Sequence, residues 1–122
     1  MSPNGKFMTQ SEYDIRVGRQ ESFLMAQDGQ FLGALTSNKY QFDSIMNQYG
    51  RYGSKYSSTS IFNQYGRYGG RYAQYSPFNP YTSTPPKIIF KGICIGVLSI
   101  NKYQKNSLDP HGLFDWIRDR RL

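Results

Sequence analysis

The chain has 122 residues and a formal net charge of +7, which suits a single domain with a modest core and a preference for anionic partners. Its one cysteine, Cys94, excludes an internal disulfide framework and a multi-cysteine metal site. No apolar run approaches the roughly 18 residues of a membrane-spanning helix, and residues 1–20 lack the apolar stretch of a signal peptide, so a cytoplasmic location is expected.

Aromatic residues and glycine dominate the composition. The chain has 11 tyrosines, 8 phenylalanines and 12 glycines, while hydrophobic residues make up only 38% of it. Aromatic rings must therefore supply much of the buried area, because aliphatic side chains are too few to fill a core. This composition favours strands and turns over long helices.

The N-terminal part divides into an arm and a hairpin. Residues 1–20 show no sustained hydrophobic period and are predicted to form a flexible arm. Residues 21–106 form the predicted β-hairpin repeat domain, whose first hairpin pairs residues 23–26 with 31–35. The dipeptide Asp28-Gly29 between them is typical of a type I′ turn, in which both central φ angles are positive.

The middle of the chain repeats itself with a step of sixteen residues. Residues 44–56 return as residues 60–72, and a third copy begins at residue 76. Segments 29–40 and 92–103 also resemble each other, at a constant offset of 63. A step of this length accommodates one short hairpin, and hairpins must pack together to bury a face. The predicted fold is all-β with a short C-terminal helix, a small closed pseudo-four-fold barrel or ring of β-hairpin repeats.

Each repeated asparagine precedes a tyrosine by two residues. Asparagine commonly caps turns by bonding its own backbone, and this structural role is the favoured interpretation. The alternative is a polar ligand site made by several amides around a ring. The rings of Tyr49, Tyr65 and Tyr81 are expected in the core, with their hydroxyls at its rim.

A second hairpin and a helix complete the chain. Residues 88–90 and 93–98 flank Lys91-Gly92, and Cys94 is expected to be buried in this apolar run. Within residues 107–122, Asp109-Pro110 is typical of a helix start, and Leu113, Trp116 and Ile117 recur at helical spacing. A short amphipathic helix is predicted over residues 110–121. Its apolar residues are expected to dock against the β domain or against a partner.

These motifs resemble one known family. The pattern N-x-Y-G-x-Y-G-S-x-Y-S at residues 47–57, its return at 63–72 and the bracketing G-x-L-[TS]-x-N-K-Y are similar to the bacterial four-fold β-flower family. The resemblance covers about residues 23–103 and includes the pair Pro85-Pro86 before the last hairpin. It implies a shallow barrel of hairpin petals with no established biochemical activity, and it supplies no catalytic residues. Gly70 departs from the pattern, since the first copy has Ser54 there.

Few residues could carry chemistry. The single histidine, His111, lies in the first turn of the predicted helix, and no carboxylates are paired for acid–base work. No cluster of histidine, cysteine and carboxylate suggests a metal site, and no glycine-rich loop has the strand-to-helix context of a phosphate site. The chain is therefore predicted not to be an enzyme and to use no cofactor and no metal.

The cations of the repeat suggest a binding function. No aspartate or glutamate lies between Ser44 and Leu108. The predicted anion-binding residues are Arg51, Lys55, Arg67 and Arg71, and the tyrosines predicted to stack on a partner are Tyr52, Tyr56, Tyr68 and Tyr72. The sequence thus favours a non-enzymatic binding module for nucleic acid, an anionic surface or an acidic protein.

Three other interpretations stay open. The cations could form only a solvated face that prevents aggregation. The chain could instead be a structural or protein-interaction module that acts, or self-associates, through Leu113, Trp116 and Ile117 or through the apolar centre of a ring. A small-molecule site at that centre is the third.

Overall fold

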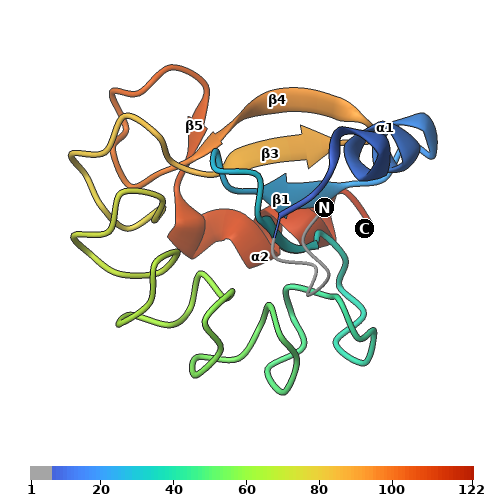
Figure 1. Ribbon diagram of the computed structural model, residues 1–122, viewed down its shortest axis with the longest axis horizontal. Coiled ribbons are helices and arrows are strands. Elements are labelled where there is room, and N and C mark those ends of the chain that lie inside the picture. The colour runs from blue at the N-terminus through green and yellow to red at the C-terminus, as the bar shows by residue number, and fades with distance from the viewer. Residues whose placement is uncertain (1–6) are drawn as a thin grey trace.

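The structure, a computed structural model that describes residues 7–122, is built on a small mixed sheet (Figure 1). The strands are β1 (Phe23–Met25), β2 (Phe31–Ala34), β3 (Lys87–Phe90), β4 (Ile93–Leu98) and β5 (Ser107–Leu108). They are arranged in the order β2-β1-β3-β4-β5, and only the β4–β5 pair is parallel. The two predicted hairpins, β1–β2 and β3–β4, are confirmed and lie side by side through β1 and β3.

The two hairpin turns differ from each other. Lys91 and Gly92 both have positive φ, at 49° and 82°, as a type I′ turn requires. In the first hairpin only Gly29 has a positive φ, at 97°. There Ala26 accepts the N–H of Gly29 and donates its own N–H to Gln30, so the loop has three residues. The type I′ turn predicted at Asp28-Gly29 is therefore wrong, because the third loop residue takes up the bend and Gly29 supplies the left-handed position.

Side chains alternate between the two faces of the sheet and supply two clusters of the core. Leu24 and Ile88 belong to the larger cluster, on the face that α2 covers. Phe23 and Ile89 belong to the smaller cluster on the opposite face, together with part of α1. Figure 1 shows α2 beneath the strands and α1 at one end of the sheet.

Helix α1 (Gln10–Gly18) lies within the predicted flexible arm and makes up 9 of its residues. The Thr9 side chain caps it by accepting the N–H of Glu12 at 3.1 Å, and the Arg16 guanidinium lies 4.0 Å from the centre of the Phe31 ring. These contacts order a segment that has no strong hydrophobic period, so the arm prediction is wrong for residues 10–18. The first six residues of the predicted arm lie outside the described part of the chain.

The predicted C-terminal helix is confirmed. It begins as the 3₁₀ turn η1 (Pro110–Gly112), where the Asp109 carboxylate accepts the N–H of His111 at 2.9 Å, and continues as α2 (Leu113–Asp119). Leu113 and Ile117 are buried in the larger cluster. The helix therefore docks against the chain's own domain and not against a partner, which were the two predicted alternatives.

Residues 36–86, which carry the repeat, form linked turns instead of hairpins. Each turn closes when the carbonyl of its first residue accepts an N–H three or four residues later, as in Ser44 to Asn47 at 3.1 Å and Asn47 to Gly50 at 2.9 Å. The last residue of one turn is the first of the next. Four steps of three residues and one step of four, from Gly50 to Ser54, make up the sixteen-residue period. We call residues 38–82 the turn spiral, which sweeps in an arc around α2 (Figure 1).

The closed pseudo-four-fold barrel or ring of β-hairpin repeats is therefore wrong. The chain contains one open, mixed five-stranded sheet with two short helices. A ring was expected because hairpins leave strand edges that must be covered. Turns that bond within themselves present no such edge, so the spiral needs no closure. The single isolated bridge in it, between Ala34 and Ser44, joins its start to β2.

Asparagine side chains hold successive turns together. Asn63 accepts the N–H of Tyr65 on its side-chain oxygen at 3.0 Å and donates its amide to the carbonyl of Ser57 at 3.1 Å. Asn47 and Asn79 make the same pair of bonds in their copies. Serines such as Ser60 cap intervening turns by accepting the N–H two residues later. The structural interpretation of the asparagines is supported by this bonding.

Two glycines allow the spiral to pack on its own backbone. A Cβ at Gly53 would lie closer than 3.0 Å to the carbonyl oxygens of Asn47 and Ile45, and one at Gly69 would meet those of Asn63 and Ile61 equally closely. Carbonyl groups fixed by the turn bonds cannot move aside cheaply. Glycine is therefore required at both positions, because the neighbouring backbone lies too close for a side chain.

We expect Gly69→Ala to lower the free energy of unfolding by about 1–3 kcal/mol, the usual cost of overpacking. Urea unfolding followed by circular dichroism measures the change. Gly18→Ala is the matched control, because nothing lies within 4 Å of the added methyl group. Equal stabilities of the two variants would contradict the packing account.

We expect Asn63→Ala to cost about 1–3 kcal/mol in the same assay, because two hydrogen bonds are lost and the Ser57 carbonyl and Tyr65 N–H lose their partners. Gln64→Ala is the control, since it changes the neighbouring exposed side chain. Asn63→Asp distinguishes the contributions of the two hydrogen bonds. Aspartate can still accept the N–H of Tyr65 but cannot donate to the carbonyl of Ser57. A destabilisation no larger for Asn63→Ala than for Gln64→Ala would show that the amide does not hold the turns.

Candidate binding surface on the turn tips

Seven tyrosines project into solvent from tips of turns, with exposed fractions of 82 to 91%. Each is the third residue of its turn, two residues after an asparagine, a serine or a glycine, and Asn101 begins the corresponding turn in the loop between β4 and β5. We call them the tip tyrosines: Tyr40, Tyr49, Tyr56, Tyr65, Tyr72, Tyr81 and Tyr103. So much exposed aromatic surface is unusual in a folded domain, which makes the turn tips a candidate interaction surface.

The local bonding explains why these rings point outward. The N–H of Tyr65 is directed back to the side chain of Asn63, so the residue sits at the bend and its ring leaves the turn. The position after the first serine of each unit points inward instead, as Ile45 and Ile61 show by their complete burial. The core positions predicted for Tyr49, Tyr65 and Tyr81 are wrong, since their exposed fractions are 91, 90 and 89%.

Cations stand beside alternate tip tyrosines. Lys39, Lys55 and Arg71, spaced sixteen residues apart, directly precede Tyr40, Tyr56 and Tyr72, and Lys102 precedes Tyr103. The ammonium groups of the three lysines lie 5.3 to 5.5 Å from the centres of the adjoining rings. Each such tip therefore presents a positive charge next to an aromatic face.

The four tyrosines predicted to stack divide into two pairs. Tyr56 and Tyr72 are exposed tip tyrosines, with exposed fractions of 82 and 84%. Tyr52 and Tyr68 are buried, at 9 and 4%. The Tyr52 ring packs edge-on against Phe31, with centres 5.0 Å apart, and belongs to the smaller cluster of the core. Tyr52 and Tyr68 are therefore not available to a partner.

The four predicted anion-binding cations also separate. Arg51, Lys55 and Arg71 are exposed, and Lys55 and Arg71 occupy turn tips. Arg67 is also exposed, but it forms an ion pair with Asp28 at 3.1 Å and lies 4.9 Å from the centre of the Tyr75 ring. Asp28 belongs to the first hairpin, outside the acid-free segment. The sequence could not show that this carboxylate reaches the repeat.

Sequence reasoning missed part of the surface, although a signal was present. Lys39, Tyr40, Lys102 and Tyr103 lie in the bracketing copies, just after the predicted hairpins, and both pairs belong to an Asn-Lys-Tyr sequence. The spacing from asparagine to tyrosine was the usable signal. An asparagine that caps its own turn places the residue two positions later at the bend.

The predicted partner-helix residues are occupied within the domain. Leu113 and Ile117 have exposed fractions of 1 and 0%. Trp116 is partly buried between Phe90, whose ring centre is 5.5 Å away, and the Arg120 guanidinium at 4.2 Å. This face of α2 is consequently not free to receive a partner.

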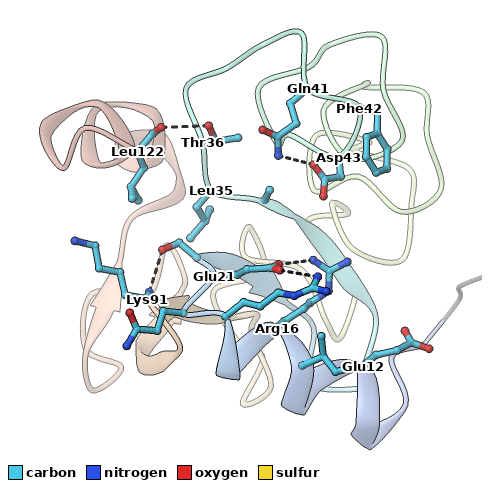
Figure 2. Close-up of a pocket in the computed structure, with 15 residues that line it drawn as sticks. Glu12, Arg16, Glu21, Leu35, Thr36, Gln41, Phe42, Asp43, Lys91 and Leu122 are labelled. Carbon is cyan, nitrogen blue, oxygen red and sulfur yellow. Dashed lines mark hydrogen bonds and ion pairs between the residues drawn. The ribbon is translucent and has the colours of Figure 1, made fainter.

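A groove of about 690 Å³ lies between α1, the end of β2 and the C-terminus (Figure 2). Several of its charged groups are engaged with their neighbours. Arg16 donates to Glu21 at 2.8 Å, and Asp43 accepts from the Gln41 amide at 2.7 Å. Arg16 also holds α1 against the sheet, as described above. The charged residues that line the groove, three basic and three acidic, thus show no concentration of one sign.

Other kinds of site find no support in residues 7–122. No group of three or more histidine, cysteine, aspartate and glutamate side chains there could hold a metal ion. No helix in this part is both long enough and apolar enough to cross a membrane. Cys94, expected in the core, is exposed, because β5 pairs only with Val97 and Leu98 and leaves the first half of β4 at the edge of the sheet.

Comparison with family models, curated proteins and solved structures finds no match to this chain. The resemblance to the four-fold β-flower family therefore stays a prediction from the motifs alone.

Tyr68 connects the turn spiral to the first hairpin and should make stability depend on alkaline pH. Its hydroxyl donates to the Asp28 carboxylate at 2.8 Å. Burial, and then this hydrogen bond, raise the pKa of Tyr68 well above the ordinary tyrosine value of 10.0. The folded chain keeps this proton at a pH where the unfolded chain releases it, so the contribution to stability is complete below about pH 10 and is lost above it.

We expect Tyr68→Phe to cost about 1.5–3 kcal/mol at neutral pH, because it removes a hydrogen bond to a charged group. It should also reduce the loss of stability that sets in as the pH rises above about 10. Urea unfolding at a series of pH values measures both effects, and Tyr65→Phe controls for the removal of one hydroxyl. An unchanged alkaline loss in Tyr68→Phe would contradict this assignment.

Proposed function

We propose that this protein is a non-enzymatic binding module for an anionic polymer, which it contacts through the tip tyrosines and the cations beside them. The observation that carries the proposal is the pairing of highly exposed rings with Lys39, Lys55, Arg71 and Lys102. Positive charges repeated along the chain favour a partner that carries repeated negative charges.

The charge distribution supports this proposal. The chain from Ser44 to Leu108 contains no acidic residue, so Asp43, near the start of the spiral, is the spiral's one carboxylate that could repel a polyanion. Within residues 7–122, the ion pair of Arg67 with Asp28 is the one salt bridge that a residue of the turn spiral makes. The exposed cations at the tips therefore keep their charge available for a ligand.

The alternative, a protein-interaction module that acts through the C-terminal helix, has less support because Leu113 and Ile117 are buried. A solvated, purely solubilising surface explains the cations and leaves the exposed rings without a reason. A cytoplasmic location, predicted from the sequence, is part of the proposal, since nucleic acid is among the polyanions found there.

Binding should weaken steeply with salt, because each cation that contacts the polymer releases counterions. Fluorescence anisotropy with labelled heparin, a generic polyanion, over a range of salt concentrations measures this dependence. We expect Lys55→Gln/Arg71→Gln to reduce the slope of log affinity against log salt by about 1.5, which corresponds to two lost contacts.

The matched control is Arg19→Gln/Arg118→Gln, which removes two exposed cations from the helices. It should leave the slope nearly unchanged. Absence of binding at low salt, or equal effects of the two double variants, would refute the proposed function.

A further inference from the structure

We infer that the anionic polymer is single-stranded nucleic acid, whose bases stack on the tip tyrosines while its phosphates contact the neighbouring cations. This inference rests on the proposed function and adds the chemical class of the ligand. It depends on three features of the spiral: the exposure of the rings, the alternation of the cations and the engagement of the asparagine amides.

The exposure of the rings favours a ligand with flat faces. Rings such as Tyr49 and Tyr65, with exposed fractions of 91 and 90%, have their faces open to solvent. Any base has a π-face that can stack on such a ring, and this contact tolerates different sequences. In a duplex the faces of the bases are already covered by their neighbours. A single strand can turn its bases outward to the protein.

The alternation of charge matches a chain in which bases and phosphates alternate. From Tyr40 to Tyr81, every second tip tyrosine follows a cation, while Gln48, Gln64 and Pro80 precede the others. The tips follow one another along the arc of the turn spiral (Figure 1). One strand laid along this arc would meet an aromatic ring at each tip and a positive charge at alternate tips.

The asparagines argue against an acidic polysaccharide. Recognition of sugar hydroxyls needs side chains that are free to donate and accept hydrogen bonds. The amides of Asn47, Asn63 and Asn79 are bonded through both oxygen and nitrogen to the backbone of the spiral. No carboxylate lies between Asn47 and Asn79 either. The asparagine amides of the tips are therefore not free to bind sugar hydroxyls, whereas the rings and the cations are exposed.

The experiment compares four probes on the full chain: a single-stranded oligothymidylate, an abasic strand of the same length, a duplex of the same length and heparin. The abasic strand keeps the phosphates and removes the bases, so it isolates stacking from charge. We expect the oligothymidylate to bind more tightly than the abasic strand and the duplex.

Variants then assign the two contributions. Tyr56→Ala/Tyr72→Ala should weaken oligothymidylate binding by at least about fivefold for each ring, the lower end of the effect of base stacking, and should leave abasic binding unchanged. Tyr56→Phe/Tyr72→Phe keeps the rings and should restore the affinity. Lys55→Gln/Arg71→Gln should weaken both strands equally. Ile93→Ala, which trims another side chain that is 66% exposed, is the control for loss of apolar surface.

Each failure has its own meaning. Equal affinities for the thymidylate and abasic strands would overturn the inference while heparin binding upheld the proposed function. Tighter binding of the duplex would also overturn it. A heparin affinity that exceeds that of the oligothymidylate and falls with the tyrosine variants would identify a polysaccharide as the ligand. If no probe bound at low salt, both proposals would fail.

Discussion

The self-bonded asparagine turn is the constraint on which the rest of this structure depends. In each copy one side chain caps its own turn and also reaches the carbonyl six residues earlier, as Asn63 does with Tyr65 and Ser57. Backbone groups that a strand would offer to a neighbour are satisfied locally. The spiral can therefore run around α2 without pairing with the sheet beyond its isolated bridge at Ser44.

This local bonding divides the residues of each unit between core and solvent. Ile45 and Ile61 face inward and, together with Leu113 and Ile117, fill the space beneath the sheet. The bends face outward, and the chain places tyrosine there at every second or third turn of the spiral. Because the tip tyrosines are exposed, their rings bury little apolar surface and contribute little to the stability of the isolated domain. Their repeated presence beside lysine and arginine is the reason to assign the tips a binding role.

The spiral is attached to the sheet by a few specific contacts. Tyr52 inserts beside Phe31, and Tyr68 and Arg67 both reach the Asp28 carboxylate at the first hairpin. The residues of the G-R-Y-G motif thus have different roles in its two copies. Both arginines are exposed, but Arg67, unlike Arg51, forms an ion pair with a carboxylate. Repetition in sequence does not make the environments equal, because only one copy lies next to Asp28.

Four features could be predicted from the sequence: the two hairpins, the C-terminal helix, the sixteen-residue period and the excess of positive charge in the repeat. These follow from short-range signals: the Lys91-Gly92 turn, the Asp109-Pro110 cap and the recurrence of identical residues. Three features required the folded chain: the repeat forms turns, Tyr49 is exposed while Tyr52 is buried, and Cys94 lies at a sheet edge. A sixteen-residue step is compatible with either a hairpin or five linked turns. The choice depends on which partners the backbone N–H and carbonyl groups find for their hydrogen bonds. Whether a ring is buried depends in turn on contacts such as Tyr52 with Phe31, which bring together residues far apart in the chain.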